Sequence, residues 1–172
     1  MINRMKQQNR LKKRKTRKRK QRGGFEPFLT VHFASSNVKL NSTMKEVELA
    51  DIQEKPHVTW SQQEGPVTLI CWDPDAPQPN KPEGFLHWLA INQTGTFPSG
   101  EQVPWSPPAP PHGFLHHYYF GLYKQTDGVS VQIPARTPFS LDDFVTKNGL
   151  SLITRVGFQT ETKSWFKDLK LF

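Results

Sequence analysis

Pro66-Val-Thr-Leu-Ile-Cys-Trp72 leads directly into Asp73-Pro-Asp-Ala-Pro77, and these two stretches decide the fold of the chain. The first is uncharged and rich in β-branched and aromatic residues, which is typical of a buried β-strand. The second is a stiff turn, because proline fixes φ and so restrains the two carboxylates. The sequence therefore predicts a buried strand that ends in a turn with held acidic side chains.

Similar strand-like stretches occur on both sides of this one. They lie at 28–33, 38–40, 57–60, 85–91, 118–123 and 129–133. Pro-rich loops at 73–82 and 104–111 separate them, and the 15 prolines of the chain leave little room for long helices. These patterns predict a mostly β protein, with one or two peripheral helices.

Two segments have helical features. In 140–149, Ser140 can cap the N-terminus, Asp142 and Asp143 fall in the first turn, and Gly149 can end the helix. In 164–172 the apolar residues recur at helical spacing. We expect both helices to lie at the periphery of the β structure.

Charge divides the 172-residue chain into two parts. Residues 1–24 contain 12 Lys or Arg and no acid, whereas residues 25–172 contain 11 basic residues and all 15 acidic ones. A run of like charges repels itself and buries nothing, so we expect a disordered basic tail at 1–24 and one folded domain at 25–172. The overall charge of +8 therefore describes the tail and not the domain.

The targeting signals in the sequence are few. No window reaches the ~18 consecutive apolar residues of a membrane-spanning helix, so we expect no transmembrane segment. No apolar stretch follows the N-terminal charges, as a secretory signal would require. Cys71 is the single cysteine and cannot form an internal disulfide. We expect an intracellular protein, cytoplasmic or nuclear, or one packaged in a virion or organelle.

Four of the six histidines lie between positions 87 and 117, close to the two Pro-rich loops. The order Asp73-Pro-Asp-Ala-Pro77, His87-Trp-Leu-Ala-Ile-Asn92, Pro110-Pro-x-Gly113 and His116-x-Tyr118 resembles the phosphatidylethanolamine-binding protein family. That family includes the Raf-kinase-inhibitor proteins and the plant flowering regulators. The resemblance runs over nearly everything except the tail, and it implies a β-sandwich of two antiparallel sheets with small flanking helices.

The same resemblance implies a small cavity at one end of the sandwich that binds a phosphoryl group. Its wall would consist of Asp73, His87, His116 and Tyr118, and its rim of Pro110 and Pro111. Imidazole N–H and phenol O–H groups can donate to phosphate oxygens, and a protonated histidine adds charge. A carboxylate repels phosphate, so we expect Asp73 to orient a histidine or to be protonated.

The resemblance also implies a cis peptide near this loop, for which Ala76-Pro77 is the candidate. The chain departs from the family pattern at three places. His117 stands where the family usually has Arg, Phe85 and Leu86 replace the usual Trp or His before the ligand histidine, and the loop between Pro111 and His116 is a residue off the usual spacing. Strand alternation places His117 on the face opposite His116.

These features predict a non-enzymatic binder of phosphoryl groups or phospholipid head groups that acts as a regulatory scaffold or inhibitor, with a protein partner. Two alternatives stay open: a hydrolase of small phosphate or ester substrates, and a protein-interaction module with an unused pocket. The chain has no Gly-x-Ser-x-Gly motif, and Cys71 lies in an apolar strand. We expect no cofactor and no metal, although Asp73, His87 and His116 are residue types that can bind zinc.

The tail allows three uses. A Lys/Arg-rich run serves as a nuclear-import signal, as a clamp on the phosphates of nucleic acid, or as an anchor to an anionic membrane surface. No aromatic residue interrupts the run, so we expect nucleic-acid binding through residues 1–24 to be nonspecific in sequence.

Overall fold

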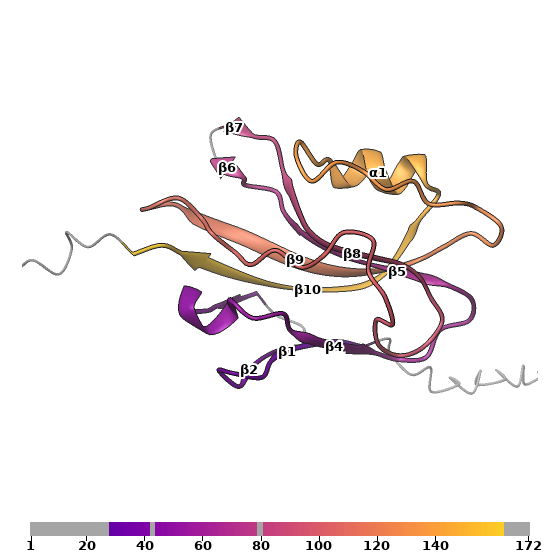
Figure 1. Ribbon diagram of the computed structural model, residues 1–172, viewed down its shortest axis with the longest axis horizontal. Helices are drawn as coiled ribbons and strands as arrows, with labels where there is room; N and C mark the ends of the chain where they lie inside the picture. Colours follow the sequence, from indigo (N-terminus) through magenta and orange to yellow (C-terminus); the bar gives the residue numbers. More distant parts are fainter. Residues whose placement is uncertain (1–27, 42–43, 79–80, 164–172) are drawn as a thin grey trace, which may run out of the picture.

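The computed structural model describes residues 28–41, 44–78 and 81–163. It contains two stacked β-sheets, with a short helix, α1, on the outer face of the larger sheet (Figure 1). The predicted two-sheet sandwich is therefore confirmed. The basic tail and the expected C-terminal helix lie outside the described residues.

The smaller sheet has the strand order β2-β1-β4, with β1 at Leu29–Phe33, β2 at Val38–Leu40 and β4 at His57–Trp60. The larger sheet has the order β3-β10-β9-β5-β8. Its strands are β3 at Lys45–Glu46, β5 at Val67–Asp73, β8 at Phe85–Gln93, β9 at Leu115–Lys124 and β10 at Ser151–Glu161. Smaller elements are the 3₁₀ helix η1 at Leu49–Ile52 and a ribbon of β6 at Pro77–Gln78 and β7 at Lys81–Pro82.

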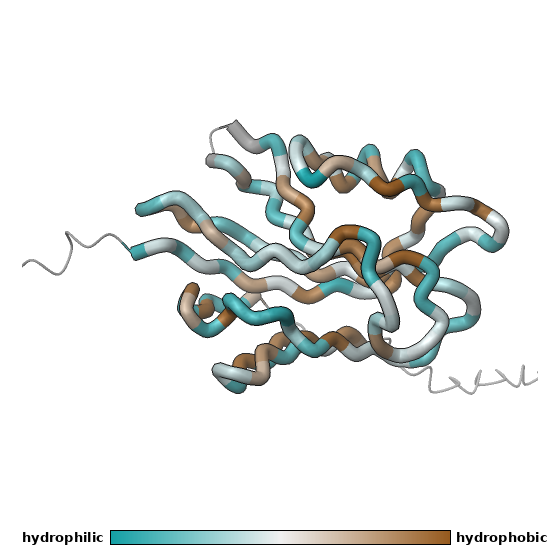
Figure 2. Tube along the Cα trace, in the orientation of Figure 1, coloured by the Kyte–Doolittle hydropathy of each residue, from teal (hydrophilic) through white to brown (hydrophobic). Residues whose placement is uncertain are grey.

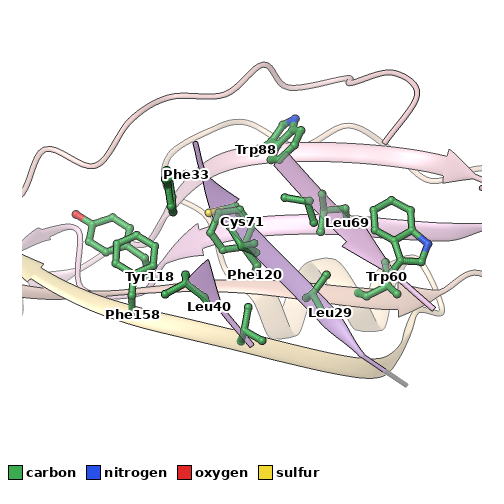
Figure 3. Packing of buried hydrophobic residues seen from close by; sticks show 14 of the residues in the cluster. Leu29, Phe33, Leu40, Trp60, Leu69, Cys71, Trp88, Tyr118, Phe120 and Phe158 are labelled. Atoms are coloured by element: carbon green, nitrogen blue, oxygen red, sulfur yellow. The ribbon is translucent and has the colours of Figure 1, made fainter. Parts of the chain in front are cut away.

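The strand β5 is buried along its whole length, because apolar layers cover both faces of the larger sheet. One layer fills the space between the two sheets and includes Phe33, Trp60, Leu69, Phe120 and Phe158 (Figure 3). The other lies beneath α1 and includes Ile70, Leu89, Tyr123, Phe139 and Phe144. Figure 2 shows hydrophobic positions along the strands of both sheets and in α1. A continuous apolar run suits a strand in this central position.

The helix α1, at Leu141–Lys147, begins and ends as its sequence predicts. The Ser140 side chain accepts a hydrogen bond from the Asp143 backbone N–H, and two acidic residues lie in the first turn. Phe144 is the buried residue of the helix and packs on Phe139. This helix covers the outer face of the larger sheet.

One predicted strand was wrong, and one long strand was not predicted. Residues 129–133 are not a strand: Val131 is buried beneath α1, and the Gln132 N–H donates to the Asn148 side chain instead of to a neighbouring strand. Conversely, the sequence did not predict β10 as a strand, although it pairs with β9 over ten positions. Among the helices that the structure describes, none is both long and apolar enough to cross a bilayer.

Candidate functional site

A cavity of about 250 Å³ opens at the end of the larger sheet where β5 ends and where β8 and β9 begin. Antiparallel pairing brings these ends together, because Asp73 lies opposite Phe85 and Trp72 lies opposite Tyr119. Five residues predicted for the site line the cavity: Asp73, His87, Pro111, His116 and Tyr118. Further lining comes from Ala76, Pro77, Phe85, Ser106, Pro107 and Ala109.

Asp73 and His116 form a buried pair in the wall of this cavity. Nδ1 of His116 lies 2.7 Å from Oδ2 of Asp73, and the two residues are only 1% and 2% exposed. The other carboxylate oxygen accepts the Asp75 backbone N–H at 2.8 Å. Nδ1 faces an acceptor and therefore carries a proton, while Nε2 of His116 is buried without a partner among the described atoms. Asp73 thus orients His116, which is one of the two roles that the sequence predicts for this carboxyl group.

His87 is held by a different kind of partner. Its Nδ1 donates to the Ser106 carbonyl at 2.6 Å, and the Ser106 N–H in turn donates to the His87 carbonyl. Burial lowers the pKa of His87, and this effect exceeds the opposing influences of the Ser106 carbonyl and Asp73. The imidazole therefore favours its neutral form, in which Nε2 is an acceptor facing the cavity.

Tyr118 lies close to both imidazoles. Its ring centroid is 5.2 Å from that of His87 and 6.4 Å from that of His116. The ring stacks on Phe158 at the end of the core, and Figure 3 shows the phenol oxygen pointing out of the cluster. Burial, followed by the charge of Asp73, raises the pKa of this phenol well above its ordinary value. Tyr118 is therefore a neutral hydrogen-bonding group.

A second Asp–His pair holds the turn from outside the cavity. Oδ2 of Asp75 accepts both the backbone N–H of His117 and its Nδ1–H, each at 2.8 Å. His117 is not among the cavity residues, which agrees with its expected place on the opposite face of β9. This pair ties the turn after β5 to the beginning of β9, and the Ala76–Pro77 bond in the turn is cis as predicted.

The sequence does not predict that Arg136 belongs to the site, because this residue lies in no recognisable motif. Its guanidinium donates to the carbonyls of Leu86, His87 and Pro104 at 2.8, 3.2 and 2.7 Å. It also lies over the Phe85 ring, with Cζ 5.7 Å from the ring centroid. Arg136 thereby fastens the loop that bears the Ser106 carbonyl to the edge strand β8.

Pro110 is not a rim residue, although the sequence placed it there together with Pro111. It is buried away from the cavity, and its carbonyl accepts the Thr162 hydroxyl at 2.5 Å. Pro107 and Ala109 lie on the cavity in its place. Alternation along the Pro-rich loop explains the difference, because neighbouring residues of an extended segment point to opposite sides.

The surroundings of the site bear on metal and nucleophile chemistry. Within residues 28–41, 44–78 and 81–163, no group of three or more His, Cys, Asp or Glu residues is arranged to hold a metal ion. Cys71 is fully buried, and its pKa is raised first by burial and then by the charge of Asp73. A raised pKa disfavours the thiolate, so this cysteine is a poor nucleophile.

Known proteins resemble this chain in sequence and in fold. Residues 33–158 match the family model for phosphatidylethanolamine-binding protein. Protein BROTHER of FT and TFL 1 from Arabidopsis thaliana is 31% identical over 136 residues, which span 74% of this chain and 76% of the relative. Protein MOTHER of FT and TFL1 homolog 2 from Oryza sativa subsp. japonica is 36% identical over 98 residues, or 52% of this chain and 56% of the relative.

Among solved structures, a carboxypeptidase Y inhibitor complexed with its cognate proteinase is similar in fold, with a TM-score of 0.68 and 23% identity. That match covers 80% of this chain and 84% of the other. A phosphatidylethanolamine-binding protein from Plasmodium vivax has a TM-score of 0.61 at 19% identity, covering 80% and 86% of the two chains. The family-model match and the Arabidopsis relative show that this chain belongs to the phosphatidylethanolamine-binding protein family.

Proposed function

We propose that the cavity binds the phosphoryl group of a small phosphorylated molecule or of a phospholipid head group, and that the protein is a non-enzymatic regulatory binder. The observation that carries this proposal is the buried Nε2 of His116, which has no partner among the described atoms. Buried polar atoms are nearly always satisfied, so an orphaned one in a cavity wall indicates a ligand contact. His87 and Tyr118 supply two more polar groups on the same cavity.

The size of the cavity supports a head group as ligand. Its volume of about 250 Å³ lies below the ~300–1,000 Å³ usual for sites that hold drug-sized molecules. A phosphoryl group with a short substituent suits such a space, whereas acyl chains do not. The name of the matching family model, phosphatidylethanolamine-binding protein, points to the same chemistry.

The charge of the cavity determines how an anion could be held there. Among the described lining residues there is no Lys or Arg, and Asp73 contributes a negative charge. Positive charge must therefore come from an imidazole, and His116 is placed for this because its Nδ1–H already faces Asp73. As an imidazolium it neutralises the carboxylate and presents Nε2–H to the ligand.

The test is a backbone-amide NMR titration of the full-length chain with O-phosphorylethanolamine, inorganic phosphate and ethanolamine in separate series. We expect saturable shifts centred on Asp73, His87, His116 and Tyr118 with both phosphate compounds, but not with ethanolamine. Shifts confined to residues 1–24 would mean that the basic tail alone binds the anion. That outcome would favour a protein-interaction module with an unused cavity; the carboxypeptidase Y inhibitor, which shares the fold, is complexed with a proteinase.

We further propose that residues 1–24 bind a polyanion, because they contain 12 cations and no acid. Binding to phosphates releases counterions, so affinity should fall by roughly 0.9 log units per phosphate contact for each tenfold rise in salt. Retention on duplex DNA and on vesicles with anionic lipid should be measured for the full chain and for a variant without residues 1–24. Equal retention of both proteins would contradict a role for the tail.

A further inference from the structure

The smaller sheet carries two histidines on its outer face, on the side of the molecule away from α1 (Figure 1). Residues along β1 and β4 alternate between buried and accessible, so one side of each strand faces the core and the other faces solvent. His32 and His57 are on the solvent side, and the antiparallel register places them directly opposite each other. Side chains that are directly opposite in such a pair have Cβ atoms about 4.5–5.5 Å apart. The two imidazoles are therefore neighbours on an accessible surface.

A second contact prepares one of these rings to bind a metal ion. Nε2 of His32 lies 3.3 Å from Oδ1 of Asn37, in the turn between β1 and β2. An amide oxygen accepts hydrogen bonds and does not donate them, so Nε2 carries the proton and Nδ1 keeps its lone pair. Histidine ligands of metals usually donate their second ring N–H to an oxygen in this way, which fixes both the tautomer and the ring orientation.

The spacing of the two rings suits a divalent transition metal. Zn–N bonds are about 2.0–2.1 Å long, so two nitrogens on one tetrahedral zinc ion lie roughly 3.3 Å apart. Rings that start from Cβ atoms about 5 Å apart can bring one nitrogen each to that separation by rotating their side chains. Imidazole suits Zn²⁺, Ni²⁺ and Cu²⁺, of which Cu²⁺ generally binds most tightly.

We propose that His32 and His57 together bind a divalent transition metal ion, with water in the remaining coordination positions. Once one imidazole is bound the second binds intramolecularly, which should raise the affinity roughly 100-fold over that of a single ring. Two protein ligands are fewer than structural or catalytic zinc sites use, so we expect the ion to exchange with solution. Neither histidine lines the cavity, so this site stands or falls separately from phosphoryl binding.

The charge beside the pair gives the site a predictable weakness. Lys39 of β2 lies opposite His32 on the side away from His57, and its side chain is exposed. Its ammonium group repels a divalent cation across a short distance in water. Replacing it with a neutral residue, in Lys39→Gln, should therefore tighten metal binding roughly twofold to fivefold at low ionic strength.

An amide NMR titration of the full-length chain with Zn²⁺ at pH 7.5 tests the proposal. We expect saturable shifts at His32, at His57 and at the residues around them, with one affinity for both histidines. Because the affinity is taken from these local shifts, metal bound elsewhere on the chain does not enter it. Cu²⁺, which is paramagnetic, should broaden the same signals, and its EPR spectrum should show nitrogen from both rings.

Single variants test whether the two rings act together. His32→Asn and His57→Asn should each weaken Zn²⁺ binding at the remaining histidine at least tenfold, because the chelate is lost. His112→Asn is the matched control: His112 is also exposed, but its neighbour across the chain is Thr162 and not an imidazole. This control should bind Zn²⁺ at His32 and His57 as the wild type does.

The possible outcomes are distinct. A loss of less than about threefold in both single variants would mean that each ring binds an adventitious ion only, and would overturn the proposal. Zn²⁺ shifts centred on the cavity, with none at His32 and His57, would overturn it as well. Should a variant fail to fold, the wild-type shifts and the Cu²⁺ EPR spectrum still decide the question, and neither result alters the test of phosphoryl binding.

Discussion

The Asp73–His116 pair offers a stringent test of how the site is built, because two buried groups depend on each other. Replacing His116 with Ala leaves the buried Asp73 carboxylate without the hydrogen bond that it accepts from Nδ1 of His116, which costs about 1.5–3 kcal/mol of unfolding free energy. Asp73→Asn alone exchanges a charge-assisted hydrogen bond for a neutral one and costs about 1.5–3 kcal/mol. In the double variant no uncompensated charge is left.

The two substitutions should therefore be strongly non-additive. Asp73→Asn destabilises the wild type, but in the His116→Ala background we expect it to stabilise the protein, by about 1–2 kcal/mol. The four proteins should be compared by urea unfolding followed by tryptophan fluorescence, with unchanged m-values as the check that unfolding remains comparable. Free energies that add within about 0.5 kcal/mol would refute the coupling between these two buried side chains.

Three further predictions follow from other contacts near the site. The pKa of His87 is lowered in the folded state, so below about pH 6.5 the unfolded chain binds more protons than the folded chain does. The free energy of unfolding should therefore fall with decreasing pH, and more steeply in the wild type than in His87→Asn, by up to about 1.4 kcal/mol per pH unit. Unfolding of both proteins at pH 7.5 and 5.5 measures this difference. Arg136→Lys cannot reproduce the planar contacts with three carbonyls and should cost about 1–3 kcal/mol, with broadened NMR signals of His87; unchanged stability and signals would contradict its fastening role. Gly84→Ala should lower the free energy of unfolding by about 3 kcal/mol or more, because φ is +69° there and a Cβ would lie 2.0 Å from the Phe139 carbonyl oxygen. Gly128 has a similar φ of +78° but lies in open space, so Gly128→Ala should cost only about 1 kcal/mol. Equal melting temperatures of the two variants would contradict this difference.

Most strands and α1 could be predicted from the sequence, because their local patterns agree with their places in the fold. The continuous apolar run that becomes β5 is buried on both faces, and Ser140 caps α1 as its position before two acidic residues indicates. In each of these segments a local signal and the tertiary environment act in the same direction.

The strand β10 shows the opposite situation. Its first five residues are exposed or half-buried, and burial increases only from Val156 onwards, so no simple alternation marks it. Its pairing with β9 creates the strand, and that contact is remote in the sequence. Residues 129–133 do alternate in the sequence, yet they form no strand, and only Val131 is buried, in the apolar layer beneath α1.

The candidate site likewise contains some features that the sequence predicts and others that it does not. Side-chain chemistry and motif order were sufficient to bring Asp73, His87, His116 and Tyr118 to one cavity, because antiparallel pairing aligns the strand ends that bear them. The Ser106 carbonyl and the three bonds of Arg136 could not be predicted, since they depend on where backbone carbonyls lie in space. The error at Pro110 has the same origin, because the path of the Pro-rich loop decides which prolines face the cavity.

Whether the cavity holds a phosphoryl group is best measured in a crystal structure of the full-length chain with O-phosphorylethanolamine. We expect phosphorus within the cavity, with phosphoryl oxygens in hydrogen-bonding distance of Nε2 of both His87 and His116, and the ammonium group toward the mouth. The reverse orientation, with the ammonium group against Asp73, would contradict it, as would a ligand bound anywhere else on the described domain.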